Sequence, residues 1–246
     1  MRTWLTVLAV AAMGLGMGSG AVALPTAAEV IDRMVARIGK ISSLEVDANW
    51  TETVNKTEHR FHYAIEVRVE DDKAVRRYSV TEKMTIPLED GRTETVESRI
   101  TCDGIWVWIE TRGPGDTGVR VRKERPAYDF PYLGMAREMK SQAGEMNWQV
   151  QEASIGNQRA FILEGHNNVE PPGTIPVNVA RKVWVGQDDL LIHRIDFLPL
   201  RSRPGVQPDT TSVTVFTNLK VNQKVDPGLF KYMPPEGAKV VEEGQP

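Results

Sequence analysis

The side chains best suited to chemistry in this sequence are four histidines, one cysteine and several acidic residues that occur in pairs. A histidine can act as a general base or bind a metal, and a cysteine can act as a nucleophile, but each needs partners at a suitable spacing. His59 and His62 are three residues apart in a stretch that alternates like a β-strand, so they are predicted to face opposite ways. Cys102 directly precedes an Asp-Gly turn, where a small, half-buried hydrophobic residue is the better interpretation.

The motifs that usually carry hydrolysis or phosphoryl transfer are absent from the sequence. It contains no His-Glu-x-x-His, no Gly-x-Ser-x-Gly elbow and no P-loop. Asp71-Asp72 and Asp188-Asp189 fall in predicted turns, where such residues serve the backbone. We therefore predict no catalytic residues, no metal and no cofactor, and interpret the chain as a protein that is not an enzyme.

Charge and composition narrow the classes of partner. The chain has 30 basic and 33 acidic residues, a net charge of −3, and no basic block, so nucleic acid is not an expected partner. A single cysteine cannot form an internal disulfide, and the fold must therefore be held by apolar burial. These features indicate an ordinary globular protein, which we expect to be a monomer.

The N-terminal segment has the layout of a secretory signal peptide. Arg2 is followed by an apolar run from Leu5 to Met17 and by the small-x-small sequence Ala21-Val22-Ala23. The run contains several glycines and is too short to span a bilayer. We predict a signal peptide over residues 1–23, a single domain over residues 24–246, and a periplasmic location.

The first element after that segment is a predicted helix. Thr26 and Glu29 have the spacing of a capping box, which satisfies amide groups at a helix start. Apolar residues then recur three and four positions apart, which predicts one buried stripe. The stripe consists of Val30, Ile31, Met34, Val35, Ile38 and Ile41.

Most of the remaining chain alternates with the two-residue period of β-strands, and turn residues separate the runs. Residues from Pro126 to Gln142 break this pattern and predict a loop and a short helix that covers the sheet. We therefore expect a mainly β (α+β) fold of about ten to eleven antiparallel strands. The predicted strands are Leu44–Thr51, Phe61–Val69, Tyr78–Ile86, Thr93–Thr101, Ile105–Ile109, Val119–Lys123, Asn147–Ala153, Arg159–Glu164, Val179–Val185, Leu190–Leu198 and Ser212–Val221.

Four segments, in order along the chain, resemble the LolA-type lipoprotein-sorting proteins of the bacterial envelope. Near the start, Ile41–Leu44 and Ala48–Val54 resemble the family's corner and first strand. Asp103–Trp108 resembles its central hairpin, and Pro131–Met139 takes the place of its helical lid. The tail Leu229–Val240 is similar to the family's ending, an aromatic pair followed by Pro-Pro-x-Gly and a short β-segment.

The resemblance implies an incomplete antiparallel β-barrel whose concave face is covered by the N-terminal and lid helices. It implies a hydrophobic trough for the acyl chains of lipoproteins or lipids, with an inner-membrane transporter as donor and an outer-membrane acceptor. The residues we expect in the trough are Trp50, Phe61, Tyr63, Ile65, Trp106, Trp108 and Phe161, and those on the covering helices are Met34, Ile38, Leu133, Met135 and Met139. For any one of them, plain core packing is the competing interpretation, because an inward strand face looks the same in both cases.

Two other functions stay open at this point. RseB-type regulators share the fold that the resemblance implies, so the chain could be a lipid-sensing regulatory or interaction module of the cell envelope. An isomerase or hydrolase in a similar half-barrel would need an acid/base pair that converges in the trough.

Overall fold

The computed structural model describes residues 23–52, 56–70, 73–112, 120–124, 131–144, 146–167, 180–198 and 212–242. The predicted signal peptide, apart from Ala23, lies outside these residues. They form two α-helices, α1 (Ala27–Ile38) and α2 (Pro131–Ser141), the short 3-10 helices η1 (Gln142–Gly144) and η2 (Pro227–Phe230), and twelve strands. The strands are β1 (Ser43–Glu52), β2 (Glu58–Glu70), β3 (Lys73–Pro87), β4 (Thr93–Cys102), β5 (Val107–Arg112), β6 (Arg120–Glu124), β7 (Met146–Ile155), β8 (Gln158–Asn167), β9 (Ala180–Gly186), β10 (Ile192–Leu198), β11 (Ser212–Val221) and β12 (Lys239–Glu242).

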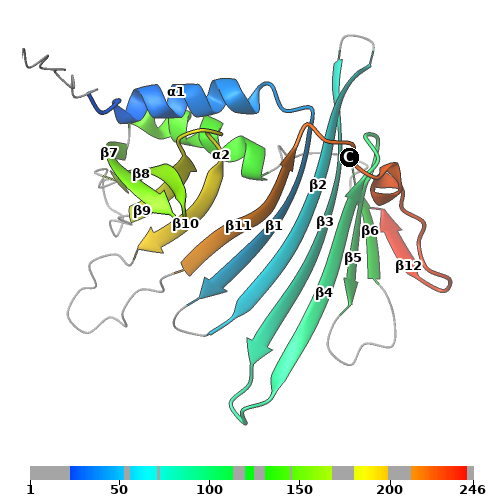
Figure 1. The fold of residues 1–246 in the computed structure, drawn as a ribbon. Coiled ribbons are helices and arrows are strands. Elements are labelled where there is room, and N and C mark those ends of the chain that lie inside the picture. The colour runs from blue at the N-terminus through cyan, green and yellow to red at the C-terminus, as the bar shows by residue number, and fades with distance from the viewer. Residues whose placement is uncertain are drawn as a thin grey trace, which may run out of the picture.

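All twelve strands belong to one curved sheet (Figure 1). Their order is β12-β6-β5-β4-β3-β2-β1-β11-β10-β9-β8-β7, and every pairing is antiparallel except that of β12 with β6. Because β12 and β7 stand at opposite ends of this order, the sheet does not close on itself. The predicted fold class, an incomplete antiparallel barrel with two helices, is confirmed, with one or two strands more than the sequence indicated.

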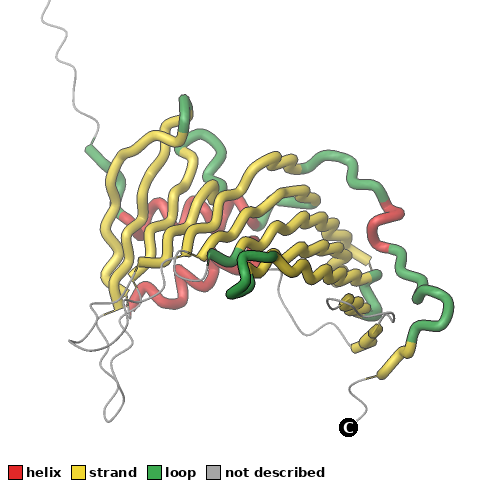
Figure 2. Tube along the Cα trace, turned by 90° about the horizontal axis from the view of Figure 1, so that it is seen from below, coloured by secondary structure: helices red, strands yellow, loops and turns green. Residues whose placement is uncertain are grey.

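Helix α1 begins where its capping box predicts. The Thr26 backbone N–H donates to the Glu29 carboxylate over 2.7 Å, and the Glu29 N–H donates back to the Thr26 hydroxyl over 3.3 Å. Of the predicted stripe, Val30, Ile31, Met34 and Ile38 are buried. These residues, together with the inner side of α2, pack on one face of the sheet (Figure 2).

The two helices cover only part of that face. Their side chains form one core with β1, β8, β9, β10 and β11, and with Ile65 of β2. We call β1 and β7–β11 the helix-covered half, and β2–β6 with β12 the open half, which extends away from the helices (Figure 1). Packing in the covered half is close enough to require a glycine at position 165, because a Cβ there would lie 2.6 Å from the Trp148 ring.

The C-terminal segment lies on the opposite face of the open half, which we call the outer face. There Val225 and Phe230 bury themselves against Ala64 of β2, and the ring of Tyr232 stacks on that of Trp108 with a centroid distance of 5.5 Å. The tail predicted as a short β-segment forms β12. No helix among the described residues is long and apolar enough to cross a membrane.

Candidate functional site: an apolar pocket beside helix α2

A pocket of about 350 Å³ opens on the helix-bearing face, at the boundary between the two halves of the sheet. Five strands and helix α2 supply its walls, and most of the side chains are aromatic or aliphatic. Strand side chains alternate between faces, so every second residue of these strands reaches the pocket. The lining residues are Trp50, His59, Phe61, Tyr63, Glu82, Tyr132, Met135, Ile195, Phe197, Thr214 and Phe216.

Aromatic rings from β1 and β2 form one wall. Trp50 and His59 are directly opposite one another in the register of β1 and β2, and their rings meet edge to face at 4.6 Å. Phe61 stacks between His59 and Tyr63, at centroid distances of 5.8 and 5.5 Å. Such a row offers a continuous apolar surface whose rings are held in place by one another.

Helix α2 forms the opposing wall and is fixed to the sheet by Tyr132. Its hydroxyl donates to the Ile192 carbonyl over 2.8 Å, and its ring meets the Phe216 ring edge to face at 4.9 Å. Burial raises the pKa of the Tyr132 phenol far above its ordinary value, so the group stays neutral. Met135, one turn along the helix, adds a flexible thioether that can adapt to different ligands.

One ionisable pair stands among these apolar groups. His59 Nδ1 lies 2.7 Å from a Glu82 carboxylate oxygen, and the other oxygen accepts a hydrogen bond from the Ser98 hydroxyl over 3.0 Å. Burial, and secondly the charge of Glu82, raise the pKa of Tyr63 and keep that phenol neutral. The pocket is therefore apolar along most of its lining and has one polar end.

The structure brings some of the expected trough and helix residues together at this pocket and places the others elsewhere. Trp50, Phe61, Tyr63 and Met135 line it. Ile65, Phe161, Met34, Ile38, Leu133 and Met139 belong to the closed core of the helix-covered half.

Trp106 and Trp108 lie away from the pocket, for a reason of register. The strand predicted from Ile105 begins only at Val107, because the Asp103 carboxylate holds the N–H groups of Ile105 and Trp106 in the turn at 2.8 Å each. Val107 and Ile109 are then opposite Cys102 and Ile100 on the inner face. Trp108 consequently faces outward against Tyr232, and Trp106 lies under the Lys123 ammonium, 4.0 Å from its ring centre.

Other lining residues were missed in the sequence. Ile195, Phe197, Thr214 and Phe216 belong to predicted strands, but no local signal indicated that β11 pairs with β1 and β10 with β11. The alternation of apolar residues in those strands is the sequence signal that could have identified them as residues of an inner face. The predicted separation of His59 from His62 is confirmed: His59 lines this pocket, whereas His62 faces outward.

The other groups considered for chemistry have structural roles. Cys102 is fully buried and its thiol donates to the Arg76 carbonyl over 3.6 Å; burial raises the pKa of the thiol, which disfavours the reactive thiolate. Asp189 accepts hydrogen bonds from the Leu191 N–H and from Gln158, and so braces the β9–β10 turn. Within the described ranges, no three or more histidine, cysteine or acidic side chains gather in a way that could hold a metal.

Comparison with known proteins gives distant similarities of structure. No family model and no curated protein sequence matches the chain. Among solved structures, LprF from Mycobacterium bovis aligns with a TM-score of 0.45 and 11% identity, over 78% of this chain and 91% of that one. A LolA superfamily protein from Nitrosomonas europaea aligns with a TM-score of 0.29 and 12% identity, over 85% and 99% of the two chains. A putative outer membrane lipoprotein-sorting protein domain from Vibrio parahaemolyticus aligns with a TM-score of 0.28 and 9% identity, over 82% of this chain and 95% of that one.

Proposed function

We propose that this protein binds an acyl chain of a lipid or lipoprotein in the pocket beside α2, and acts as a carrier without a chemical step. The observation that supports this most directly is the pocket's lining, in which aromatic and aliphatic side chains from β1, β2, β10, β11 and α2 surround about 350 Å³ of space. Sites for small ligands fall in this size range and are mostly apolar.

The free energy available to such a site is sufficient without special polar contacts. Each buried methylene contributes about 0.8 kcal/mol, so even part of one long chain can supply micromolar binding. The inner face of the open half continues the apolar surface beyond the pocket through Val80, Met84, Ile100 and Ile109, which are all half-buried. In our proposal, the part of the chain that exceeds the pocket lies along these strands.

The polar end of the pocket sets the orientation of the ligand in this proposal. A carboxylate beside one ring nitrogen fixes the orientation of an imidazole and leaves its second nitrogen for another partner. We assign that partner as the carbonyl or carboxyl group of the acyl ligand, at His59. The hydrocarbon would then extend toward Met135 and Phe216.

The cellular setting that we propose follows from the N-terminal segment. A signal peptide over residues 1–23 would deliver a single domain, residues 24–246, to the periplasm. There the carrier would accept acylated cargo from an inner-membrane transporter and pass it to an outer-membrane acceptor. A regulatory module would instead retain its ligand and copurify with a signalling protein in a pulldown.

Ligand binding can be tested by placing a larger side chain in the pocket through a substitution on β11. Thr214 lines the pocket, while its neighbour Val215 points to the outer face and is exposed. We expect Thr214→Phe to weaken the binding of a fluorescent fatty acid by about tenfold or more, since it displaces two or more methylenes, and Val215→Phe to leave binding unchanged. Solvent extraction of the purified protein and mass spectrometry should find bound lipid. A protein that carries no lipid and binds no fatty acid would refute the proposal.

The orientation can be tested with the two histidines of β2. His59→Gln should weaken the binding of palmitate but not of hexadecane, because only the former has a polar head. His62→Gln, which changes the same residue type on the opposite face, should affect neither ligand. Equal losses for palmitate and hexadecane would show that His59 does not contact the head group.

A further inference from the structure

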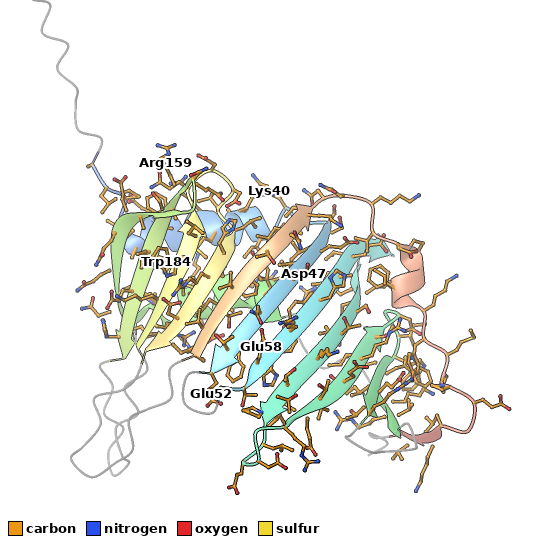
Figure 3. The ribbon with its side chains drawn as sticks, turned by 60° about the horizontal axis from the view of Figure 1, so that its bottom comes forward. Lys40, Asp47, Glu52, Glu58, Arg159 and Trp184 are labelled. Atoms are coloured by element: carbon orange, nitrogen blue, oxygen red, sulfur yellow. The ribbon has the colours of Figure 1, made fainter. Side chains whose placement is uncertain are left out.

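A second and larger hollow, of about 930 Å³, lies on the outer face of the open half, where the C-terminal segment crosses the sheet. Figure 3 shows this face, with Asp47 on β1 and the C-terminal segment beyond it. Outward-pointing side chains of β1–β5 form the floor, and Lys231–Pro235 form one side. We call this hollow the outer groove. The apolar pocket lies on the other face of the sheet, and the two hollows share only Phe61 and Glu82 in their linings.

Charged side chains line the outer groove, and the carboxylates among them are already engaged. Asp47 binds His62 over 2.6 Å and Asn218 over 2.7 Å. Glu97 lies 3.6 Å from the Lys83 ammonium. Glu110 has one oxygen 3.0 Å from Arg112, and its other oxygen accepts a hydrogen bond from the Tyr232 hydroxyl over 2.9 Å.

The Arg99 side chain donates no hydrogen bond and forms no ion pair among the described residues. It is directly opposite Glu110 on the neighbouring strand, but the two oxygens of that carboxylate bind Arg112 and Tyr232 instead. The Nε–H of Arg99 is buried and has no hydrogen-bond partner among the described residues. A buried donor without an acceptor is costly, and in a native structure it marks a place where an acceptor is expected.

The C-terminal segment adds a second cation to the same groove. Lys231 lines that side of the groove, and no ion pair involves its side chain within the part of the chain described. Arg99 and Lys231 therefore supply positive charge that the groove's own carboxylates do not neutralise.

We propose that the outer groove binds an oxyanion, a phosphate or carboxylate group, with Arg99 as the principal ligand and Lys231 as the second. Two parallel N–H groups of a guanidinium match two oxygens of such a group. Bound there, the anion is the acceptor that the Arg99 guanidinium lacks among the described residues. Phosphate can come from a free metabolite or from a phospholipid head group, and both sources present the same oxygens.

The proposal can be tested by recording the NMR signal of the Arg99 Nε–H. This signal is assigned as the one that disappears from the spectrum of the Arg99→Lys variant. Addition of inorganic phosphate, and separately of acetate, at constant ionic strength should shift this signal in a saturable manner. Arg99→Gln should lower phosphate affinity by about tenfold. Arg99→Lys should retain only part of the affinity of the unmodified protein, because an ammonium lacks the two parallel N–H groups of a guanidinium. Arg92→Gln, which removes an arginine from the exposed β3–β4 turn, is the control of equal charge and should change nothing.

Sedimentation with phosphatidylglycerol vesicles, compared with phosphatidylcholine vesicles, separates the two sources. Vesicle binding that Arg99→Gln abolishes and Arg92→Gln preserves assigns a lipid head group; a response to phosphate alone assigns a small soluble anion. Lys231→Gln should weaken either interaction less than Arg99→Gln. The proposal is overturned if no anion shifts the Arg99 signal, or if Arg92→Gln reduces binding as much as Arg99→Gln does. Fatty-acid binding by Arg99→Gln should stay normal, so this result is independent of the carrier proposal.

Discussion

The two halves of the sheet differ in how far their apolar inner face is buried. In the helix-covered half, α1 and α2 bury that face, and side chains such as Met34, Leu163 and Val183 are completely enclosed. In the open half, the same kind of alternation leaves Val80, Ile100 and Ile109 only half-buried, while the C-terminal segment covers part of the outer face. The apolar pocket lies at the boundary, where coverage by α2 ends.

In the proposed carrier, this difference would let one sheet combine stability with ligand binding. The covered half supplies a packed core, which tolerates little change in volume. The open half exposes apolar surface that a protein would normally bury, and such surface is typical of binding sites. The comparison predicts that equal substitutions in the two halves will have unequal effects on unfolding and on binding.

The largest difference should come from the same truncation made in each half. Ile192→Ala removes a side chain that is 1% exposed in the covered half, and should lower the free energy of unfolding by about 2–5 kcal/mol. Ile100→Ala, in the open half, should cost less, about 1–2 kcal/mol, because part of its side chain is already exposed. Urea unfolding measures both. Similar losses would mean that the open half is as well packed as the covered half.

A smaller effect should appear in the way the free energy of unfolding depends on pH, through Asp189 of the covered half. Burial alone would raise the pKa of the Asp189 carboxyl, but hydrogen bonds from His193 and from the Leu191 N–H outweigh it and leave the pKa below its ordinary 3.8. A lowered carboxyl pKa stabilises the fold above the ordinary value, and this contribution is lost as the pH falls through the folded-state value.

Asp189→Asn should therefore be less stable than the unmodified protein at about pH 6, with a gap that narrows below about pH 4. Asp188→Asn, whose side chain is exposed on the same turn, should show no such narrowing. Urea unfolding at a series of pH values checks this. A gap that stays constant with pH would mean that the ionisation of Asp189 does not stabilise the fold.

The smallest effect should come from the ion pair that joins the two helices. Lys140 of α2 lies 2.8 Å from Asp32 of α1, and both side chains are more than half exposed. A double-mutant cycle with Lys140→Ala and Asp32→Ala should give a coupling of at most about 0.5 kcal/mol. A coupling of several kcal/mol would show that charge, and not the buried stripe, holds α2 over the sheet.

Much of the local structure could be predicted because its causes are local. The capping box of Thr26 and Glu29 places the start of α1, and alternation with turn residues places most of the strands. Alternation also separates His59 from His62. It could not show which face of a strand is the inner one, and so Trp108 was expected in the trough although it stacks on Tyr232 outside.

By itself, the sequence determined the elements, their polarity pattern and the absence of familiar catalytic motifs, since these depend on residues a few positions apart. Only the tertiary structure decided that β11 pairs with β1, and that Tyr132, Phe197 and Phe216 therefore join Trp50 and Phe61 around one pocket. It alone also showed that the Nε–H of Arg99 has no acceptor, because that depends on how the neighbouring strand and the C-terminal segment are placed. Such contacts join residues far apart in the chain, and their formation depends on packing, which no short-range pattern encodes.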